Sequence, residues 1–310
     1  MIIEISTHGS TLKRNHDSFV IQNGETKSEF PAEKIDSILI SANSLVSSEA
    51  IRLAIEKQIH MVFTSWNGSP YARIWTPSQG KSSKLRRWQY LNQDSPTGIE
   101  ISKDIITRKI KNQKKFLIEL KNNRNKTNTV LENTITSLNE NLENIELQKV
   151  KEKLLGYEGL CAKIYFAAIS SILPTKWRFS ERSQHPALDG FNSALNYIYG
   201  IGYSDVEKII ILSGLEPNAG FLHADSYGKP TLSFDLIEII RPSLDKIIVG
   251  LFTKRKARQD WFEENIGGVF LTKEGRMQII SNYAEMKKEI EKSIWEYCQK
   301  IIGKFEAENS

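Results

Sequence analysis

The sequence predicts a two-domain α+β protein. A small β-rich N-terminal domain, β-sandwich-like with one helix, precedes a larger all-α domain. Residues 1–78 hold short β-branched runs separated by turn residues, whereas apolar residues recur at helical spacing over most of the later chain. The polar stretch TPSQGKSSK between them contains Pro and Gly and is typical of a linker. We therefore expect a β-rich domain over 1–78, a linker over 79–84 and a helical domain over 85–310.

The N-terminal elements follow from short β-branched runs and the turns between them. Asn23-Gly24 is a strong hairpin signal, because both residues tolerate the left-handed backbone of a tight turn. Residues 47–58 predict an amphipathic helix with Ser47 or Ser48 as its N-cap. Strands are expected around this helix and hairpin, at residues 1–6, 18–22, 35–41, 60–65 and 71–77.

Beyond the linker, the sequence predicts helices almost to its end. One or two long polar helices are expected over 103–155, and the later helices over 148–172, 190–214, 233–252 and 277–304. The segment 148–172 is rich in apolar and small residues. We expect this helix to be buried, with Gly156 and Gly159 allowing close helix approach.

Composition excludes several classes of protein. No apolar run reaches the length of about 18 residues that would indicate a membrane span. The N-terminus lacks the basic and then apolar pattern of a signal peptide. Two cysteines, Cys161 and Cys298, cannot form a disulfide framework or a zinc knuckle. We therefore expect a cytoplasmic protein without a membrane partner.

Basic residues gather in three clusters with aromatic side chains nearby. The net charge is +5, and the sequence pI is about 8.9. The clusters lie at residues 81–90, 103–126 and 253–258. Any one of them is equally compatible with a solvated helix face, but together they favour a nucleic-acid partner.

An imidazole, two carboxylates and a guanidinium fall within residues 220–242. A loop rich in Gly and Pro ends at His223, and a predicted helix then carries Asp235, Glu238 and Arg241. The two acids are three residues apart on one helix face in an apolar segment, so burying both is costly without a cation. Alternatively, Arg241 pairs with Glu238 as a structural ion pair.

A third carboxylate, Glu158, is the only acid in the apolar segment 154–173. It either pairs with Lys163 or joins the same site. One histidine and two or three carboxylates suit Mg²⁺ or Mn²⁺ better than structural zinc, which favours Cys and His. A hard cation beside basic clusters predicts phosphoryl transfer on nucleic acid. We interpret the other histidines as ordinary core or surface residues: His8, His16, His60 and His185.

Four motifs follow the β-rich domain in order: GYEGLCAKIYF, DGFNSALNYIYGIGY, GLEPNAGFLH and LSFDLIEIIRP. In this order they resemble the CRISPR-associated endonuclease/integrase family, the metal-dependent integrase that inserts new spacers into a CRISPR array. The likeness covers most of the chain. The segment ERSQHPALDGF matches the family pattern only loosely.

The resemblance implies a site, a reaction and partners. The metal ligands would be Glu158, His223 and Glu238, with Asp235 as an adjacent catalytic acid that could also bind directly. The metal, Mg²⁺ or Mn²⁺, would serve a transesterification that joins prespacer 3′-OH ends to the CRISPR repeat. Homodimers would form through the N-terminal domain. Two of them would flank a dimer of a small ferredoxin-like partner protein, in a heterohexamer that carries double-stranded DNA.

Further side chains are candidates for DNA contact. Tyr165 lies seven residues after Glu158 on the same helix face, and it is equally compatible with a core tyrosine. The basic candidates are Arg86, Arg87, Lys229, Arg241, Lys254, Arg255, Lys256 and Arg258. Two other functions fit the same sequence: a stand-alone structure-specific nuclease on branched DNA, and a non-catalytic DNA-binding scaffold.

Overall fold

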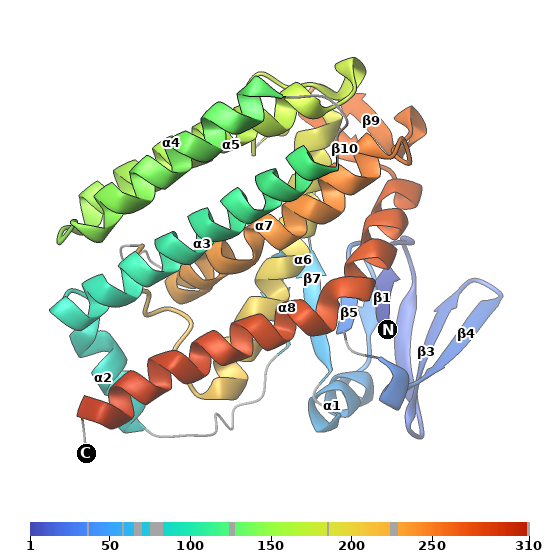
Figure 1. The fold of residues 1–310 in the computed structure, drawn as a ribbon. Helices are drawn as coiled ribbons and strands as arrows, with labels where there is room; N and C mark the ends of the chain where they lie inside the picture. Colours follow the sequence, from blue (N-terminus) through green and yellow to red (C-terminus); the bar gives the residue numbers. More distant parts are fainter. Residues whose placement is uncertain are drawn as a thin grey trace.

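The computed structural model describes residues 1–35, 37–57, 59–64, 70–74, 83–123, 128–184, 186–223 and 229–308. It has a β-rich N-terminal region and a larger, largely helical region beside it (Figure 1). This confirms the predicted fold class. Most of the predicted linker lies outside the described residues. Its last two positions, Ser83 and Lys84, already belong to the first helix of the helical region.

Two sheets form the N-terminal region. One has the order β1 (Ile2–Ile5), β5 (Ser37–Ile40), β7 (His60–Thr64) and β8 (Pro70–Arg73), with only the β7–β8 pair antiparallel. The other has the order β4 (Thr26–Pro31), β3 (Ser18–Asn23), β2 (Thr11–Asn15) and β6 (Leu45–Val46).

Local sequence signals explain two connections within this region. The predicted hairpin joins β3 to β4, and Gly24 takes the left-handed φ of 58° that the turn needs. Helix α1 (Ser48–Glu56) begins where predicted, because the Ser47 hydroxyl accepts from the Ala50 N–H at 3.2 Å. Its apolar side packs on a core with Leu12, Phe19 and residues of both sheets.

The helical region is built mainly from long helices. The predicted polar stretch 103–155 belongs to three helices: one ends at Asn122, the next spans Thr129–Glu146, and the third begins at Lys151. The helices are α2 (Ser83–Asn92), α3 (Pro96–Asn122), α4 (Thr129–Glu146), α5 (Lys151–Ile172), α6 (Gly190–Ser213), α7 (Thr231–Thr253) and α8 (Lys273–Glu308).

Helix α7 lies at the centre of this region. It packs against α3, α6 and α8, and most of its side chains are buried, which its nearly continuous apolar sequence favours. Pro242 lies inside the helix and offers no N–H to the carbonyl of Glu238 four residues earlier. Asn112 of α3 donates to the neighbouring carbonyl of Ile239 at 3.1 Å. Three acids of α7, Asp235, Glu238 and Asp245, are buried in this interior.

Two features of the helical region differ from the sequence prediction. A short hairpin, β9 (Phe262–Asn265) and β10 (Gly268–Leu271), interrupts the helices. Its strands have four residues each, too few for alternation to stand out. Gly156 and Gly159 also serve no close packing, because a Cβ at either position would meet no atom within 4 Å. The inward face of α5 is instead formed by residues such as Leu154, Cys161 and Tyr165.

Polar contacts join the two regions. Arg276 of α8 donates to Glu4 of β1 at 3.0 Å. Lys287 of α8 is buried, lies 3.2 Å from the Asp205 carboxylate and donates to Ser37 of β5 at 3.3 Å. Among the described helices, none is both long and apolar enough to cross a membrane.

Candidate active site

Two glutamates from different helices meet at one lysine. Glu158 of α5 and Glu238 of α7 both contact the ammonium of Lys109 of α3, with Glu238 Oε2 2.5 Å from Nζ. The Lys109 side chain is 3% exposed and that of Glu238 is 5% exposed, whereas Glu158 is 21% exposed. Two carboxylates therefore share one cation at a buried position that opens towards Glu158.

Helical periodicity explains this convergence. Lys109 lies on the buried stripe of α3, four residues after Ile105 and four before Gln113. Glu158 lies on the buried stripe of α5, four residues after Leu154 and seven before Tyr165. Lys109 therefore faces inward from α3, and Glu158 reaches it from the edge of the buried stripe of α5, where its side chain stays 21% exposed.

The charges in this cluster stabilise one another. Burial lowers the pKa of Lys109, but the Glu238 and Glu158 carboxylates outweigh it, and the pKa lies above its ordinary value. Burial raises the pKa of Glu238, but Arg241 and Lys109 outweigh it, and that pKa is lowered. Lys109 and Glu238 are therefore both ionised near neutral pH.

Arg241 completes the charge balance of Glu238. Its Nη1 lies 2.8 Å from Glu238 Oε1, and its Nη2 donates to the Tyr203 hydroxyl at 2.8 Å. The guanidinium carbon lies 5.0 Å from the centre of the Tyr199 ring. The alternative prediction of an ion pair between Arg241 and Glu238 is thus confirmed.

His223 is held by Asp235. The Asp235 carboxylate is fully buried and lies 2.7 Å from His223 Nδ1. It also accepts the backbone N–H groups of Phe221, Leu222 and His223 at 2.6, 2.9 and 3.0 Å. Burial lowers the pKa of His223, but the hydrogen bond and charge of Asp235 outweigh it, so the pKa is raised. Asp235 therefore positions the imidazole and leaves Nε2 as its available nitrogen.

The predicted ligands do not yet form a closed cage. Among the described residues, no group of three His, Cys, Asp or Glu side chains converges on one point. Oε2 of Glu238 is a buried oxygen that accepts no well-aligned hydrogen bond, although it touches the Lys109 ammonium. Two carboxylates around one cation, with an imidazole nitrogen nearby, still form a donor set that suits Mg²⁺ or Mn²⁺.

A second buried layer lies two helical turns along α7. The Asp245 carboxylate accepts the Tyr165 hydroxyl at 2.9 Å and the Tyr199 hydroxyl at 2.5 Å. Burial raises the pKa of Asp245 to about 6, and the two tyrosine hydrogen bonds oppose this shift. The layer ties α5, α6 and α7 together beneath Glu158 and Glu238.

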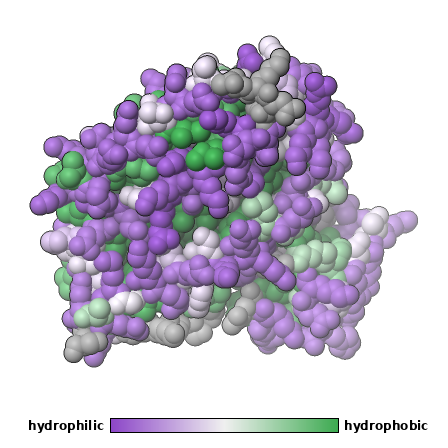
Figure 2. All heavy atoms as spheres, viewed as in Figure 1, coloured by the Kyte–Doolittle hydropathy of each residue, from purple (hydrophilic) through white to green (hydrophobic). Residues whose placement is uncertain are grey.

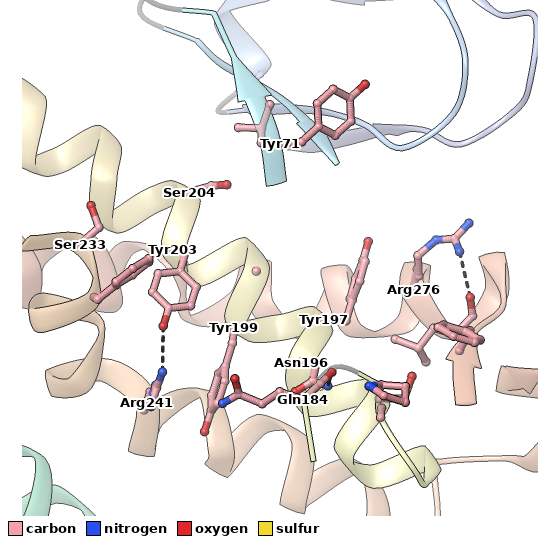
Figure 3. Close-up of a pocket in the computed structure, with 18 of the residues that line it drawn as sticks. Tyr71, Gln184, Asn196, Tyr197, Tyr199, Tyr203, Ser204, Ser233, Arg241 and Arg276 are labelled. Carbon is pink, nitrogen blue, oxygen red and sulfur yellow. Dashed lines mark hydrogen bonds between the residues drawn. The ribbon is translucent and has the colours of Figure 1, made fainter. Parts of the chain in front are cut away.

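A cavity of about 650 Å³ begins at Arg241 and extends between α6 and the β7–β8 strands (Figure 3). In this view Tyr71 lies across from Tyr203 on the facing wall. Two buried polar atoms of its lining, Ser233 Oγ and Arg241 Nε, have no hydrogen-bond partner in the described part of the chain. The cavity thus joins the charged cluster to an aromatic and polar space.

Residues 3–285 match the family model of CRISPR associated protein Cas1. The chain belongs to the Cas1 family. The CRISPR-associated endonuclease Cas1 1 of Archaeoglobus fulgidus is 32% identical over 259 residues, covering 78% of this chain and 74% of that protein. As a Cas1 endonuclease, the protein is a DNA-cleaving enzyme of the family involved in spacer integration.

Solved structures share the Cas1 fold over nearly the whole chain. A Cas1 protein from Thermotoga maritima aligns with a TM-score of 0.85 at 20% identity, covering 97% of each chain. A casposase bound to integration product gives 0.84 at 21% identity, covering 98% of this chain and 91% of that one. A Cas6-RT-Cas1–Cas2 complex gives 0.83 at 17% identity, covering 99% of this chain and 35% of that one. At these identities the structures establish the fold.

The DNA-contact candidates of this Cas1 chain fall into two groups. Tyr165 is fully buried and bonded to Asp245, so its interpretation as a DNA contact is wrong and that as a core tyrosine holds. Arg86 donates to the carbonyl of Gly214 at 3.4 Å. The other basic candidates apart from Arg241 are exposed: Arg87, Lys229, Lys254, Arg255, Lys256 and Arg258. Hydrophilic side chains also cover most of the face seen in Figure 2.

Sequence reasoning missed Lys109 as a site residue. It counted this lysine among the surface bases of 103–126, and it considered Lys163 as the partner of Glu158. The signal was present, because Lys109 falls on the apolar stripe that contains Ile105, Ile106 and Ile110. Two bases of that cluster, Arg124 and Lys126, lie outside the described residues.

Proposed function

We propose that this protein is a metal-dependent DNA integrase of CRISPR adaptation, which joins prespacer 3′-OH ends to the CRISPR repeat by transesterification. The observation that carries the proposal is the convergence of Glu158 and Glu238 on one cation position. Oxygen donors of this kind hold the Mg²⁺ or Mn²⁺ ions that serve phosphoryl transfer. The casposase structure, by its description bound to integration product, supports the same class of reaction.

In this proposal Glu158, Glu238 and His223 would hold the divalent ion, with Nε2 as the imidazole donor. The two carboxylates would hold it where they now contact the Lys109 ammonium. When bound, it supplies Lewis-acid stabilisation of charge on the phosphate and the oxygens that attack and leave it.

The remaining site residues position and balance these ligands. Asp235 fixes the Nδ1 side of His223 and the backbone before it, so that Nε2 faces outward. Arg241 keeps Glu238 ionised and oriented, and it stays inside the site as a fixed positive charge. The layer of Asp245, Tyr165 and Tyr199 holds α5 against α7, and so keeps Glu158 close to Glu238.

The DNA path in this proposal runs along α7. Lys229 precedes the helix and residues 254–258 follow it. At about 1.5 Å per residue, Lys254 lies about 24 Å along the axis from Glu238. Exposed bases at this distance suit phosphates several base pairs from the reacting one. The cavity beside Arg241, lined by Tyr71, Tyr203 and other rings, suits an unpaired nucleotide of the reacting strand.

The partners follow from the family and its neighbours. One structural neighbour is described as a complex that contains Cas1 and Cas2. We include in the proposal a homodimer formed through the β-rich region over 1–78, and two such dimers flanking a dimer of the small ferredoxin-like partner. The edge strand β4, with mostly exposed side chains, offers unpaired backbone groups for such an association.

A strand-transfer assay tests the proposal. A labelled duplex with free 3′-OH ends is incubated in Mn²⁺ with a supercoiled plasmid that carries a CRISPR repeat, with and without the partner. Wild type is compared with Glu158→Gln, and with Glu152→Gln on the exposed side of the same helix as the matched control. We expect label in the plasmid with wild type and Glu152→Gln, and at least a 100-fold loss with Glu158→Gln, whose DNA affinity is retained.

The other outcomes separate the alternative functions. Duplexes with 3′-dideoxy ends should give no labelled plasmid. Cleavage of branched DNA without any insertion would replace the integrase with a stand-alone nuclease. Bound DNA with neither reaction, in wild type as well as Glu158→Gln, would make the carboxylates structural and the protein a scaffold.

A further inference from the structure

The loop that carries His223 rests on helix α2. Gln89 of α2 is fully buried, and its Nε2 donates to the carbonyls of Glu216 and Ala219 at 2.8 and 2.6 Å. Its Oε1 accepts the N–H of Glu216 at 2.9 Å. One turn later, Gln93 donates to the carbonyl of Gly220 at 3.0 Å. Both Nε2 hydrogens of Gln89 are thus committed to the loop backbone.

The same loop is held from its other side by α7. Asp235 accepts the three N–H groups from Phe221 to His223, and the Thr231 hydroxyl accepts the N–H of Gly220 at 2.9 Å. A Cβ on Gly220 would lie 2.9 Å from Asp235 Oδ2 and from the Thr231 carbonyl carbon, so only glycine fits between them. The loop is therefore clamped between α2 and α7.

The end of the last helix supports α2. The indole N–H of Trp88 donates to the Glu308 carboxylate at 2.6 Å, and the Trp88 ring lies 5.8 Å from that of Phe305. On its other side, the Trp88 ring lies 6.4 Å from Phe221 of the loop. Figure 1 shows α2 beside the C-terminal end of α8. Contacts thus run without a break from the end of α8, through α2, to the loop of His223.

We propose that Gln89 is a positioning residue of the active site, which sets the place of His223 by fixing the loop backbone between Glu216 and Ala219. This inference rests on the proposed role of His223 as a metal ligand. Residues that orient a ligand typically change metal affinity or activity about 10- to 100-fold when they are replaced. Gln89 acts from outside the site, because its three hydrogen bonds go to the backbone of Glu216 and Ala219.

The test compares Gln89→Met, which keeps the side-chain volume and removes all three hydrogen bonds, with Ser170→Ala. Ser170 is a matched control, because its buried hydroxyl clamps the backbone of Phe179, donating to its carbonyl at 2.6 Å and accepting its N–H at 3.1 Å. We expect Gln89→Met to raise the Mn²⁺ Kd, measured by electron paramagnetic resonance, at least tenfold. It should lower strand-transfer kcat in proportion while duplex affinity stays within about twofold. Ser170→Ala should lose stability only.

Two further readouts make the result decisive. The imidazole ¹H–¹⁵N signal of His223 should shift or broaden in Gln89→Met, and this measurement needs neither metal nor DNA. Gln93→Ala should act in the same direction with a smaller effect, and it replaces Gln89→Met if that variant does not fold. Wild-type Mn²⁺ affinity and an unchanged His223 signal in the folded variant would overturn the inference. A wild type that binds Mn²⁺ and transfers no strand would instead overturn the proposed function alone.

Discussion

Replacing Lys109 with methionine tests the charge arrangement of the site. The ammonium touches both Glu158 and Glu238, and its side chain is 3% exposed. Methionine fills similar space without the charge, so Glu238 keeps Arg241 as its partner and Glu158 loses the ion pair that it makes with Lys109. Removing one partner of a buried ion pair costs about 3–5 kcal/mol. At about 2–4 °C per kcal/mol, the Tm of metal-free Lys109→Met should fall by about 10 °C.

Divalent metal should reverse part of this loss. A ligand at about 100 times its Kd stabilises a folded protein by about 2.7 kcal/mol. In the proposed site, the metal has to displace the Lys109 ammonium in wild type, whereas no ammonium stands between the carboxylates in Lys109→Met. Mn²⁺ should therefore raise the Tm of Lys109→Met more than that of wild type.

The assay is differential scanning fluorimetry across a Mn²⁺ titration, with Lys111→Met as the control. Lys111 lies on the same helix, and it is exposed. The control should melt like wild type at every Mn²⁺ concentration. An equal Mn²⁺ response in Lys109→Met and wild type would refute the reasoning, because metal and ammonium would then occupy different places.

Three other predictions follow from the site and its surroundings. Asp235→Asn should lower the His223 pKa towards its ordinary 6.5, measured by NMR titration of the metal-free protein, and an unchanged pKa would contradict the assigned hydrogen bond. Burial raises the pKa of Asp245 in the folded protein to about 6, from 3.8, so the folded protein binds this proton more tightly than the unfolded chain does. The stability that this gives is complete below pH 3.8 and is lost as the pH rises through about 6. Asp245→Asn should remove that fall, about 3 kcal/mol, from urea-denaturation curves measured between pH 4 and 7. Neutralising the bases of 253–258 should flatten the plot of the logarithm of the DNA-binding constant against the logarithm of salt concentration. The slope should change by about one unit for each phosphate that these bases contact, whereas an unchanged slope would mean that they are surface residues without a role in DNA binding.

Local sequence signals predicted the fold class and several elements. The Asn23-Gly24 hairpin, the cap at Ser47 and the apolar run of α7 each depend on neighbouring residues only. The β9–β10 hairpin escaped prediction, because its short strands are defined by packing. Gly268 is in contact range of the backbone of Ala187, and Phe262 packs on Trp177. Such contacts join segments distant in sequence.

In the candidate site, too, the sequence predicted what neighbouring residues determine and missed what distant contacts determine. The loop of His223 and the acids of α7 are close in sequence, so their pattern predicted that they belong to one site. The structure brings Asp235 and His223 together. Lys109 comes to the site only through the packing of α3 on α7, and a lysine in a run of bases is more often on the surface. Helical periodicity could have placed Lys109 on the buried stripe, but only the fold identifies Glu158 and Glu238 as its partners.

The charge balance of the site predicts that metal and DNA bind together. Glu158 and Glu238 are matched by Lys109 and Arg241, so the buried cluster carries no net charge without metal. A divalent ion in place of the Lys109 ammonium adds at least one positive charge, which is costly to bury unless anions accompany it.

The phosphates of the bound DNA supply those anions, so DNA should tighten Mn²⁺ binding, and by linkage Mn²⁺ should tighten DNA binding by the same factor. Both factors can be measured with an unreactive duplex that has 3′-dideoxy ends, using electron paramagnetic resonance for Mn²⁺ and fluorescence anisotropy for DNA. Lys109→Met should weaken the coupling, because its site is negative before metal arrives. Equal Mn²⁺ affinity with and without DNA in wild type would mean that the phosphates do not reach the carboxylates. The metal would then have to be placed elsewhere.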